Sequence, residues 1–331
     1  MRSRFVFLAG ALVVPFLAAC ASQSATTPGQ ASEGAGVQSV RAQVRFGLTP
    51  QQIESADAQR GNGYLHKSKL KATLFVSDID ADTIRLFPAN KTNPTQKGAI
   101  TTGIDLPVNA AVDPKGTLYV ANNGNSTVTE YPFGKTSPSV TLSGVQLVYP
   151  NGIAVDNSDT VYVTSGASAG SCYVLVYPKG ASTPSRQING FDLPVGLAVD
   201  KSGNLYVGDA LQNAVWEVPA GSTTPSKLAL SGLDDPTGLA IDSSNNLWVA
   251  NDQSNTVLGF HLGDTSPFVT ITNGLSGPYS IAFEKTGTLF VGNSLHYPGN
   301  VAGFKSGSTT EFESIGVENP AGLAVYPKPK D

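Results

Sequence analysis

The chain has 331 residues, of which 40% are hydrophobic and only 14% are charged, and its formal net charge at pH 7 is −4. Its 35 glycines and 22 prolines are typical of an all-β protein with many turns, and the hydrophobic residues suffice for one large folded domain. The acidic balance argues against nucleic acid as a partner, because a nucleic-acid-binding face needs an excess of Lys and Arg.

The N-terminus has the pattern of a bacterial lipoprotein signal. Arg2 and Arg4 precede an apolar run over residues 5–16, and two small alanines stand directly before Cys20. Residues 1–19 are therefore predicted to be removed. The Cys20 thiol is predicted to carry a diacylglyceryl thioether, a palmitate-type lipid anchor. An ordinary secretory signal with an incidental cysteine is the alternative, and the apolar run is shorter than the roughly 20 residues of a membrane span.

Two segments are predicted between the signal and the folded domain. Residues 20–48, rich in Ser, Thr, Gly, Ala and Gln, are expected to form a flexible tether. Residues 49–71 are expected to hold a short helix, from residue 50 to about 60, because Thr49 and Pro50 resemble a helix start. Ala21 stands where lipoproteins of the inner membrane often carry Asp, so the anchor is expected in the outer membrane, facing the periplasm.

A repeated phrase fills the rest of the chain. It reads Pro-x-Gly-h-Ala-h-Asp, where h is an apolar residue, and Gly-x-Leu-Tyr-Val follows it. Its prolines are 42 to 44 residues apart, at Pro107, Pro150, Pro194, Pro236, Pro278 and Pro320. This period, with short apolar runs that lack helical spacing, is typical of the four-stranded blades of a propeller.

Each unit divides into four short strands joined by tight turns. In the unit that starts at Pro194 the expected strands cover residues 196–199, 205–207, 215–218 and 227–230. The first unit lacks its inner strand, and the last contains only one, over residues 321–326. The C-terminal strand is therefore predicted to complete the first blade. The sequence thus predicts an all-β, six-bladed β-propeller over residues 72–331.

The repeat resembles that of known propellers. The stretches that carry the resemblance are Asn151-Gly152-Ile153-Ala154-Val155-Asp156, Leu205-Tyr206-Val207 and Asn255-Thr256-Val257. They are similar to NHL repeats and to the superfamily that holds the gluconolactonase/regucalcin lactonases, over about residues 72–327. The resemblance implies the fold, but propellers of this kind include enzymes, receptors and scaffolds alike.

Resemblance to the lactonases implies a test at the propeller axis. Those enzymes bind one divalent metal there through a Glu, two Asn and an Asp of the inner strands. The residues after the repeat prolines are expected to occupy that ring, namely Val108, Asn151, Val195, Thr237, Tyr279 and Ala321. Only Asn151 could be a ligand, whereas hard cations need several oxygen ligands, usually with carboxylates among them. No metal, cofactor or catalytic residue is therefore predicted.

Several other reactive residue types are assigned structural roles. The aspartates that end the inner strands are expected to cap their own turns, at Asp113, Asp156, Asp200 and Asp242. Residues 78–82 imitate the start of a calcium loop, but Thr83 and Ala89 stand where the loop needs Gly and Glu. Cys172 is expected to be a small buried residue rather than a nucleophile.

The binding site is predicted from two hairpins that break the repeat. Residues 164–171 and 294–299 are insertions between the second and third strands of their blades. These hairpins and the segments that lead to the repeat prolines are expected on one face, here called the top face. A ligand site at its axial mouth is predicted from Tyr149, Asn151, Tyr279, His296 and Tyr297. The alternative is that the insertions are variable loops without a function.

Charge on that face indicates the kind of ligand. Arg is missing from its loops, and the aspartates expected there are Asp78, Asp105, Asp192, Asp209, Asp234, Asp235 and Asp252. An acidic mouth favours cationic or polyhydroxyl ligands.

Taken together, these features favour a lipid-anchored, non-catalytic NHL-like propeller of the bacterial cell envelope. It would bind an unknown protein, peptide or glycan and contact the membrane only through Cys20. The alternatives are a metal-dependent lactonase or esterase, and a structural spacer without a ligand.

Overall fold

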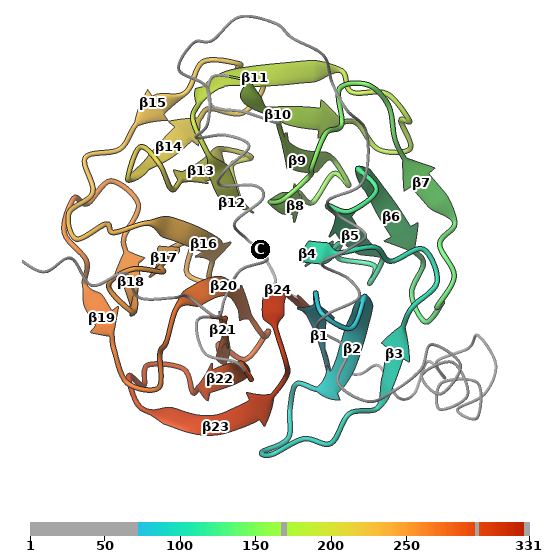
Figure 1. The fold of residues 1–331 in the computed structure, drawn as a ribbon. Helices are drawn as coiled ribbons and strands as arrows, with labels where there is room; N and C mark the ends of the chain where they lie inside the picture. Colours follow the sequence, from blue (N-terminus) through green and yellow to red (C-terminus); the bar gives the residue numbers. More distant parts are fainter. Residues whose placement is uncertain (1–71, 167–170, 295–297, 328–331) are drawn as a thin grey trace, which may run out of the picture.

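The computed structural model describes residues 72–166, 171–294 and 298–327, which form six four-stranded antiparallel sheets in a ring (Figure 1). The predicted six-bladed propeller is confirmed. The predicted signal peptide, tether and short helix lie outside the described residues. The described residues contain no helix, and so none that could cross a membrane.

Blade 1 is built from both ends of the described chain. Its strands, from the axis outward, are β24 (Pro320–Tyr326), β1 (Thr73–Asp78), β2 (Thr83–Pro88) and β3 (Gly98–Ile100). β24 pairs antiparallel with β1, with Tyr326 opposite Thr73 and Pro320 opposite Asp78. The predicted closure by the C-terminal strand is confirmed, and it leaves no unpaired edge at the seam of the ring.

The other five blades each use four consecutive strands. Blade 2 contains β4 (Pro107–Val112), β5 (Leu118–Asn122), β6 (Thr127–Tyr131) and β7 (Val140–Leu142). Blade 3 contains β8 (Ile153–Val155), β9 (Val161–Ser165), β10 (Cys172–Tyr177) and β11 (Arg186–Phe191). Blade 4 contains β12 (Pro194–Val199), β13 (Leu205–Asp209), β14 (Ala214–Val218) and β15 (Ser226–Lys227). Blade 5 contains β16 (Pro236–Ile241), β17 (Leu247–Asn251), β18 (Thr256–Phe260) and β19 (Val269–Ile271). Blade 6 contains β20 (Pro278–Phe283), β21 (Leu289–Asn293), β22 (Asn300–Phe304) and β23 (Glu311–Gly316).

The outermost strand of blade 4 is shorter than the sequence predicts. β15 forms only two residue pairs, opposite Trp216 and Glu217, whereas the pattern predicts a strand over residues 227–230. An outer strand pairs on one side only, so fewer hydrogen bonds fix its extended conformation. Leu228 and Leu230 still pack against the core, but from irregular chain.

Each blade is apolar on both faces because both faces are covered by neighbouring blades. All five residues of β13 are buried. Leu205 and Val207 pack with blade 3, whereas Tyr206, on the opposite side of the strand, packs with Leu247 and Val249 of blade 5. Alternate side chains of one strand thus belong to two interblade cores, which explains why the Leu-Tyr-Val stretch has no polar face.

The glycine of the repeated phrase is required by the close approach of neighbouring inner strands. A Cβ on Gly152 would lie 2.1 Å from the carbonyl oxygen of Val195 in the next blade. A Cβ on Gly196 would lie 2.3 Å from the carbonyl oxygen of Thr237. Both distances are far inside van der Waals contact, so only glycine lets the inner strands pack this closely around the axis.

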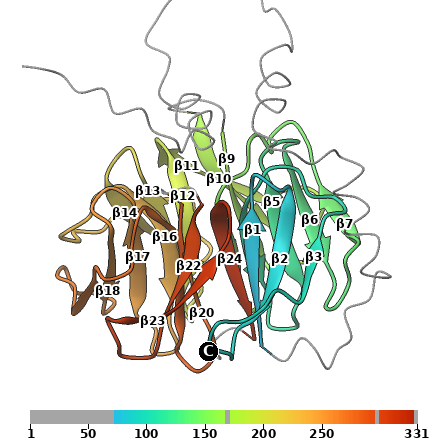
Figure 2. The ribbon, with the colours of Figure 1, turned by 60° about the horizontal axis from the view of Figure 1, so that its bottom comes forward.

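The two faces of the ring carry different connections. In blade 4, Pro194 lies opposite Asp209, and Asp209 lies opposite Ala214. The hairpins between second and third strands and the segments leading to the repeat prolines therefore share one face, as predicted for the top face. The remaining turns lie on the opposite, bottom face (Figure 2). Thr73 and Tyr326, at the ends of β1 and β24, both lie at the bottom face.

Candidate binding face

The residues that follow the repeat prolines meet around the axis near the top face. Asn151, Val195, Thr237, Tyr279 and Ala321 are buried, and Val108 is half-buried. Several of them belong to one apolar cluster that also includes Ile79 and Leu193 from loops of blades 1 and 4. The axis is therefore packed with side chains at this level.

Asn151 of blade 3 and Tyr279 of blade 6 are hydrogen-bonded to each other across the ring. Tyr279 Oη lies 3.1 Å from Asn151 Nδ2 and 3.3 Å from Asn151 Oδ1. Asn151 is 2% exposed and Tyr279 is 5% exposed. Burial raises the pKa of the Tyr279 phenol, so the hydroxyl stays protonated at physiological pH. The structure thus brings two predicted site residues together, but as a buried pair beneath the mouth.

Among the predicted site residues that the structure describes, Tyr149 is the one that solvent reaches. Its side chain is 43% exposed, and its backbone N–H donates a 3.2 Å hydrogen bond to Ser126 Oγ in the hairpin of blade 2. His296, Tyr297 and Cys20 lie outside the described residues. Blades 3 and 6, which carry the two insertions, lie on opposite sides of the ring (Figure 1).

The regular top-face hairpins are fastened to the next blade by a repeated hydrogen bond. The polar residue directly before the third strand accepts, through its side chain, a hydrogen bond from the backbone of the next blade. The donor is the N–H of the residue that precedes the next repeat proline. The pairs are Asp82 with Leu106 at 2.8 Å, Ser126 with Tyr149 at 3.2 Å, Asn213 with Asp235 at 3.1 Å, and Asn255 with Gly277 at 2.6 Å. In blade 4 the N–H of Leu193 donates instead to Asp209, at 3.0 Å. A regular hairpin in blade 3 would make this contact with Leu193, but the hairpin of blade 3 carries an insertion. In the sequence, this contact corresponds to an Asp, Ser or Asn that recurs directly before the third strand.

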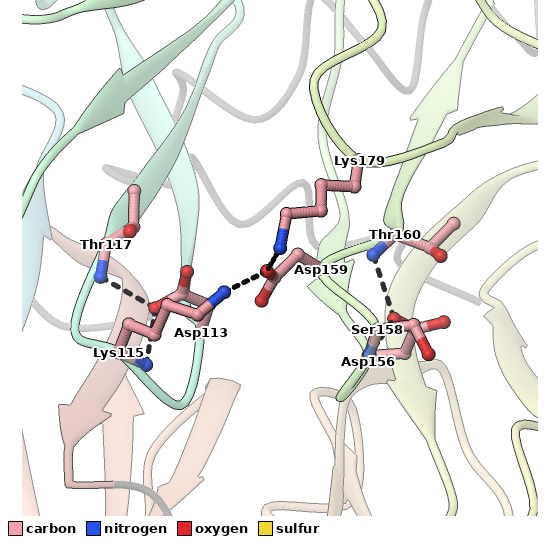
Figure 3. Close-up of polar contacts among 8 residues, drawn as sticks. All are labelled: Asp113, Lys115, Thr117, Asp156, Ser158, Asp159, Thr160 and Lys179. Carbon is pink, nitrogen blue, oxygen red and sulfur yellow. Dashed lines mark hydrogen bonds and ion pairs between the residues drawn. The ribbon is translucent and has the colours of Figure 1, made fainter.

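The aspartates at the ends of the inner strands cap turns on the bottom face. Oδ1 of each accepts the backbone N–H groups two and four residues further on, at 2.8 to 2.9 Å, in Asp113, Asp156, Asp200 and Asp242. Figure 3 shows this arrangement for Asp113 and Asp156. Glu284 accepts the N–H of Thr286 at 2.9 Å in the same place of blade 6. The predicted structural role is confirmed.

Two of the seven aspartates expected at the acidic mouth are buried in the blades instead. Asp209 accepts three backbone N–H groups, at 2.7, 3.0 and 3.1 Å, and Asp78 forms a 2.6 Å ion pair with Arg85 Nε. Both are 0% exposed, so the prediction that they line the mouth is wrong. Both are the last residue of a second strand. At this position in blade 4, the Asp209 side chain binds the backbone of the top-face segment that precedes the blade, at Asp192 and Leu193. The other blades use Asn122, Ser165, Asn251 and Asn293 there.

Asp235 and Asp252 lie on adjoining top-face loops of blade 5. The backbone N–H of Asp252 donates to the carbonyl oxygen of Asp235 at 3.0 Å. Burial raises the pKa of both carboxyls, and with repulsion from Asp235 it raises the pKa of Asp252 to about 6. This part of the mouth therefore gains negative charge as the pH rises through 6.

Among the described connections, the basic residues lie on the bottom face. The described top-face connections contain neither Lys nor Arg, and their acidic residues are Asp80, Asp82, Asp105, Asp192, Asp234, Asp235, Asp252 and Glu318. The bottom-face turns carry Lys91, Lys97, Lys115, Lys135, Lys179, Lys201, Lys285 and Lys305. On that face Asp159 forms ion pairs with Lys115 and, at 2.6 Å, with Lys179 (Figure 3). These two ammonium groups lower the pKa of the Asp159 carboxyl.

The top face also exposes apolar side chains. Val145 is 95% exposed and Leu211 is 45% exposed, and both lie on top-face connections, as Tyr149 does. Apolar side chains beside acidic loops are the mixture found where proteins bind other proteins.

The axial ring does not fit the divalent metal that the lactonase resemblance implies. Its amide, Asn151, is bonded to Tyr279, and the other side chains of the ring include no carboxylate. No group of three or more His, Cys, Asp and Glu able to hold a metal occurs in the described part of the chain. Cys172 is 3% exposed, a small buried residue as predicted.

Below this ring the inner strands line a cavity of about 170 Å³. Its lining includes the alanine of every repeat: Ala111, Ala154, Ala198, Ala240, Ala282 and Ala324. Because sites for drug-sized ligands usually measure about 300 Å³ or more, the cavity is small for such a molecule.

Comparison with known proteins agrees with this architecture. The family described as SMP-30/Gluconolactonase/LRE-like region matches residues 61–294. The search of curated proteins found no match. A chain of a nidogen/laminin complex is 16% identical, with a TM-score of 0.66, over 78% of this chain and 100% of that one.

Two bacterial structures are also similar. A protein of unknown function from Bacteroides caccae is 10% identical, with a TM-score of 0.61, over 78% of this chain and 100% of that one. A functionally unknown protein from Desulfotomaculum acetoxidans is 16% identical, with a TM-score of 0.55, over 75% of this chain and 82% of that one. At these identities the likeness concerns the fold alone.

Proposed function

We propose that this chain, which belongs to the SMP-30/gluconolactonase/LRE-like family, is a non-catalytic propeller that binds a protein, peptide or glycan through its top face. In this proposal it is held in the bacterial cell envelope by a lipid at Cys20, in the outer membrane and facing the periplasm. The observation that carries the binding function is the composition of the top face, whose loops are acidic and expose Val145, Tyr149 and Leu211.

This composition favours a cationic segment of a protein or peptide as the ligand. Acidic loops without Lys or Arg attract positive charge, and long-range attraction of this kind weakens as salt screens it. Exposed apolar side chains supply the contact area that remains at high salt. Asp235 and Asp252 lie at the mouth, and the rise of the Asp252 pKa to about 6 makes this attraction weaker below pH 6.

Pull-downs from envelope extracts with face-specific variants test the binding function. The top-face variants are Leu211→Ser and Asp234→Asn combined with Asp235→Asn, and the bottom-face control is Lys285→Ala. A partner that recognises the top face is retained by the control and lost by both top-face variants. After purification its affinity should fall from 50 to 500 mM salt. Equal capture by all variants, or an affinity independent of salt, contradicts the proposal.

The lipid anchor is tested by mass spectrometry of the mature N-terminus. A diacylglyceryl group on Cys20, and release of the Cys20→Ser variant from membranes, is the expected result. A mature chain without lipid, or a disulfide-linked peptide of Cys20 and Cys172, rules the anchor out.

A lactonase or esterase remains the competing function, because the family includes such enzymes. Its test is the metal content of the purified protein, followed by lactone and ester hydrolysis with and without a chelator. Stoichiometric metal together with turnover that the chelator abolishes would establish the enzyme and overturn a purely binding function.

A further inference from the structure

A second cavity lies between blades 5 and 6, with bottom-face turns at its rim. Its volume is about 360 Å³, within the range of roughly 300 to 1,000 Å³ of small-molecule sites. Aromatic side chains form much of its lining: Trp248, Phe268, Phe283 and Phe304. Neither the repeat nor the top-face function accounts for it.

Two of these aromatic residues stand at repeat positions where other blades have a different residue. Trp248 stands where the repeat has Tyr119, Tyr162 and Tyr206 in blades 2, 3 and 4. Phe268 stands where blades 2 and 3 have a serine. The backbone N–H of Phe268 donates across its blade at 2.9 Å, as those of Ser139 and Ser185 do at 2.8 Å. Blade 5 thus has larger aromatic rings at both places, and these two rings contact each other, whereas blade 6 has Phe290 and Phe312 there.

Two further departures from the repeat lie at the same place. His261 of blade 5 and Lys305 of blade 6 start the turn between the third and fourth strands, at a position where the other four blades have a proline. The turn itself is unchanged, because the carbonyl of His261 accepts a 3.0 Å bond from the residue three further on, as that of Pro132 does at 2.9 Å. Substitutions at three repeat positions therefore meet here: Trp248, Phe268 and Lys305 line the cavity, and His261 stacks on Phe268 beside it.

The aromatic groups form a fixed wall rather than a loose patch. The His261 ring stacks on Phe268, with centroids 4.4 Å apart and planes 11° apart. Trp248 meets Phe268 edge-on at 5.7 Å and Phe283 at 5.3 Å. His261 Nδ1 lies 2.8 Å from Asn246 Oδ1, which fixes the imidazole. Phe268 nevertheless is 46% exposed, an apolar ring that the fold leaves partly uncovered.

The polar rim of the cavity is made of hydroxyl groups. Ser243, Ser244, Ser306 and Ser308 line it. The carboxylate of Asp242 is already engaged, since Oδ2 accepts the Trp248 indole N–H and the Asn246 amide, both at 2.9 Å. Its Oδ1 accepts two backbone N–H groups. The Lys305 ammonium lies 5.3 Å from the centre of the Phe312 ring. The rim therefore offers mainly groups that both donate and accept hydrogen bonds.

We propose that this cavity binds a sugar ring of a neutral glycan. A pyranose presents an apolar C–H face, which packs on aromatic rings, and hydroxyls at its edge, which match serine hydroxyls. A charged ligand is disfavoured, because the one carboxylate of the cavity is saturated by protein donors and the lysine lies over an aromatic ring. This site is separate from the top face, and it does not depend on the proposed top-face function.

Calorimetric titration of the full chain with maltotriose, cellotriose and N-acetylchitotriose tests the proposal. At least one is expected to bind saturably, with a dissociation constant in the millimolar range or below. The Trp216→Phe variant leaves Trp248 as the only tryptophan, and the same sugar should change its fluorescence. The decisive variants return blade 5 to the repeat, Trp248→Tyr and Phe268→Ser. The tyrosine hydroxyl can reach the capping aspartate, as Tyr206 does at 3.3 Å from Asp200, so the variant should fold.

Each revertant is expected to weaken sugar binding at least tenfold, with an unchanged circular dichroism spectrum and thermal midpoint within a few degrees. Ser139→Ala, at the place in blade 2 that corresponds to Phe268, is the matched control and should bind as the unmodified protein does. The proposal is overturned if none of the three sugars binds at 10 mM. It is equally overturned if both revertants keep the original affinity, because the sugar then binds elsewhere.

Discussion

Replacing Glu313 by glutamine should stabilise the propeller at neutral pH but not at acidic pH. Glu313 lies in β23, is 4% exposed, and its Oε2 has no hydrogen-bond partner among the described residues. Burial raises the pKa of this carboxyl from 4.5 to about 7, and a hydrogen bond from the backbone of Asn93 offsets only part of that effect. The folded protein thus prefers the protonated form.

The sign and size of the effect follow from the two pKa values. Below pH 4.5 the carboxyl is protonated in the folded and unfolded chains alike, so ionisation costs nothing. As the pH rises from 4.5 to 7, only the unfolded chain ionises freely, and the free energy of unfolding falls by about 1.4 kcal/mol per pKa unit of the difference. For a rise from 4.5 to about 7 this amounts to about 3 kcal/mol, fully lost above pH 7. Glutamine cannot ionise, so the variant avoids the loss.

Urea unfolding at pH 4, 6 and 8 measures the effect. The difference in unfolding free energy between Glu313→Gln and the unmodified protein should grow by about 3 kcal/mol from pH 4 to pH 8, with unchanged m-values. Glu318→Gln removes one charge from an exposed residue and should show no such growth. A Glu313→Gln difference that is the same at pH 4 and pH 8 would refute the reasoning, because it would mean that the carboxyl ionises normally in the folded protein.

Three further predictions concern the ring. Gly196→Ala places a Cβ 2.3 Å from a carbonyl oxygen of the next blade and should destabilise the protein by roughly 2 to 3 kcal/mol in urea unfolding, whereas Gly316→Ala, with no atom within 4 Å, should cost less than about 1 kcal/mol. Tyr279→Phe leaves the buried Asn151 amide without its partner and should cost about 1 to 3 kcal/mol; a neutral result would mean that water or another group replaces the phenol. Asp159→Asn removes a carboxyl whose pKa is lowered by Lys115 and Lys179, so it should reduce the melting temperature at pH 7, and the reduction should shrink as the pH falls below the ordinary pKa of 3.8; an equal reduction at pH 7 and pH 2 would exclude the ion pairs as its cause.

The architecture could be predicted because one local sequence pattern repeats along the chain. The regular spacing of the prolines, with short strands and turn residues between them, defines the blade, and the missing inner strand of the first unit requires the C-terminal strand. The capping role of Asp113 and its equivalents was equally readable, since it depends only on a turn within a few residues. Such features involve neighbours in the chain, and the sequence contains all of their parts.

The exposure of individual acidic residues could not be predicted in the same way. Asp209 and Asp234 both lie on the top-face side of blades 4 and 5, yet Asp209 is 0% exposed and Asp234 is exposed. The difference arises because Asp209 ends a second strand and binds the backbone of a loop 16 and 17 residues earlier in the chain. The role of Asn151 likewise depended on Tyr279, which lies 128 residues away and in the opposite blade.

The sequence by itself determined the number of blades, their strand order and the closure of the ring, because each follows from a repeat that dictates the same local structure six times. Only the tertiary structure decided how the departures from that repeat combine. Trp248, His261, Phe268 and Lys305 are scattered over almost 60 residues, and they meet because a blade folds back on itself three times and then packs against the next one. Side-chain contacts between strands and blades depend on this packing, so the cavity and the buried axial pair appear only when the ring is assembled.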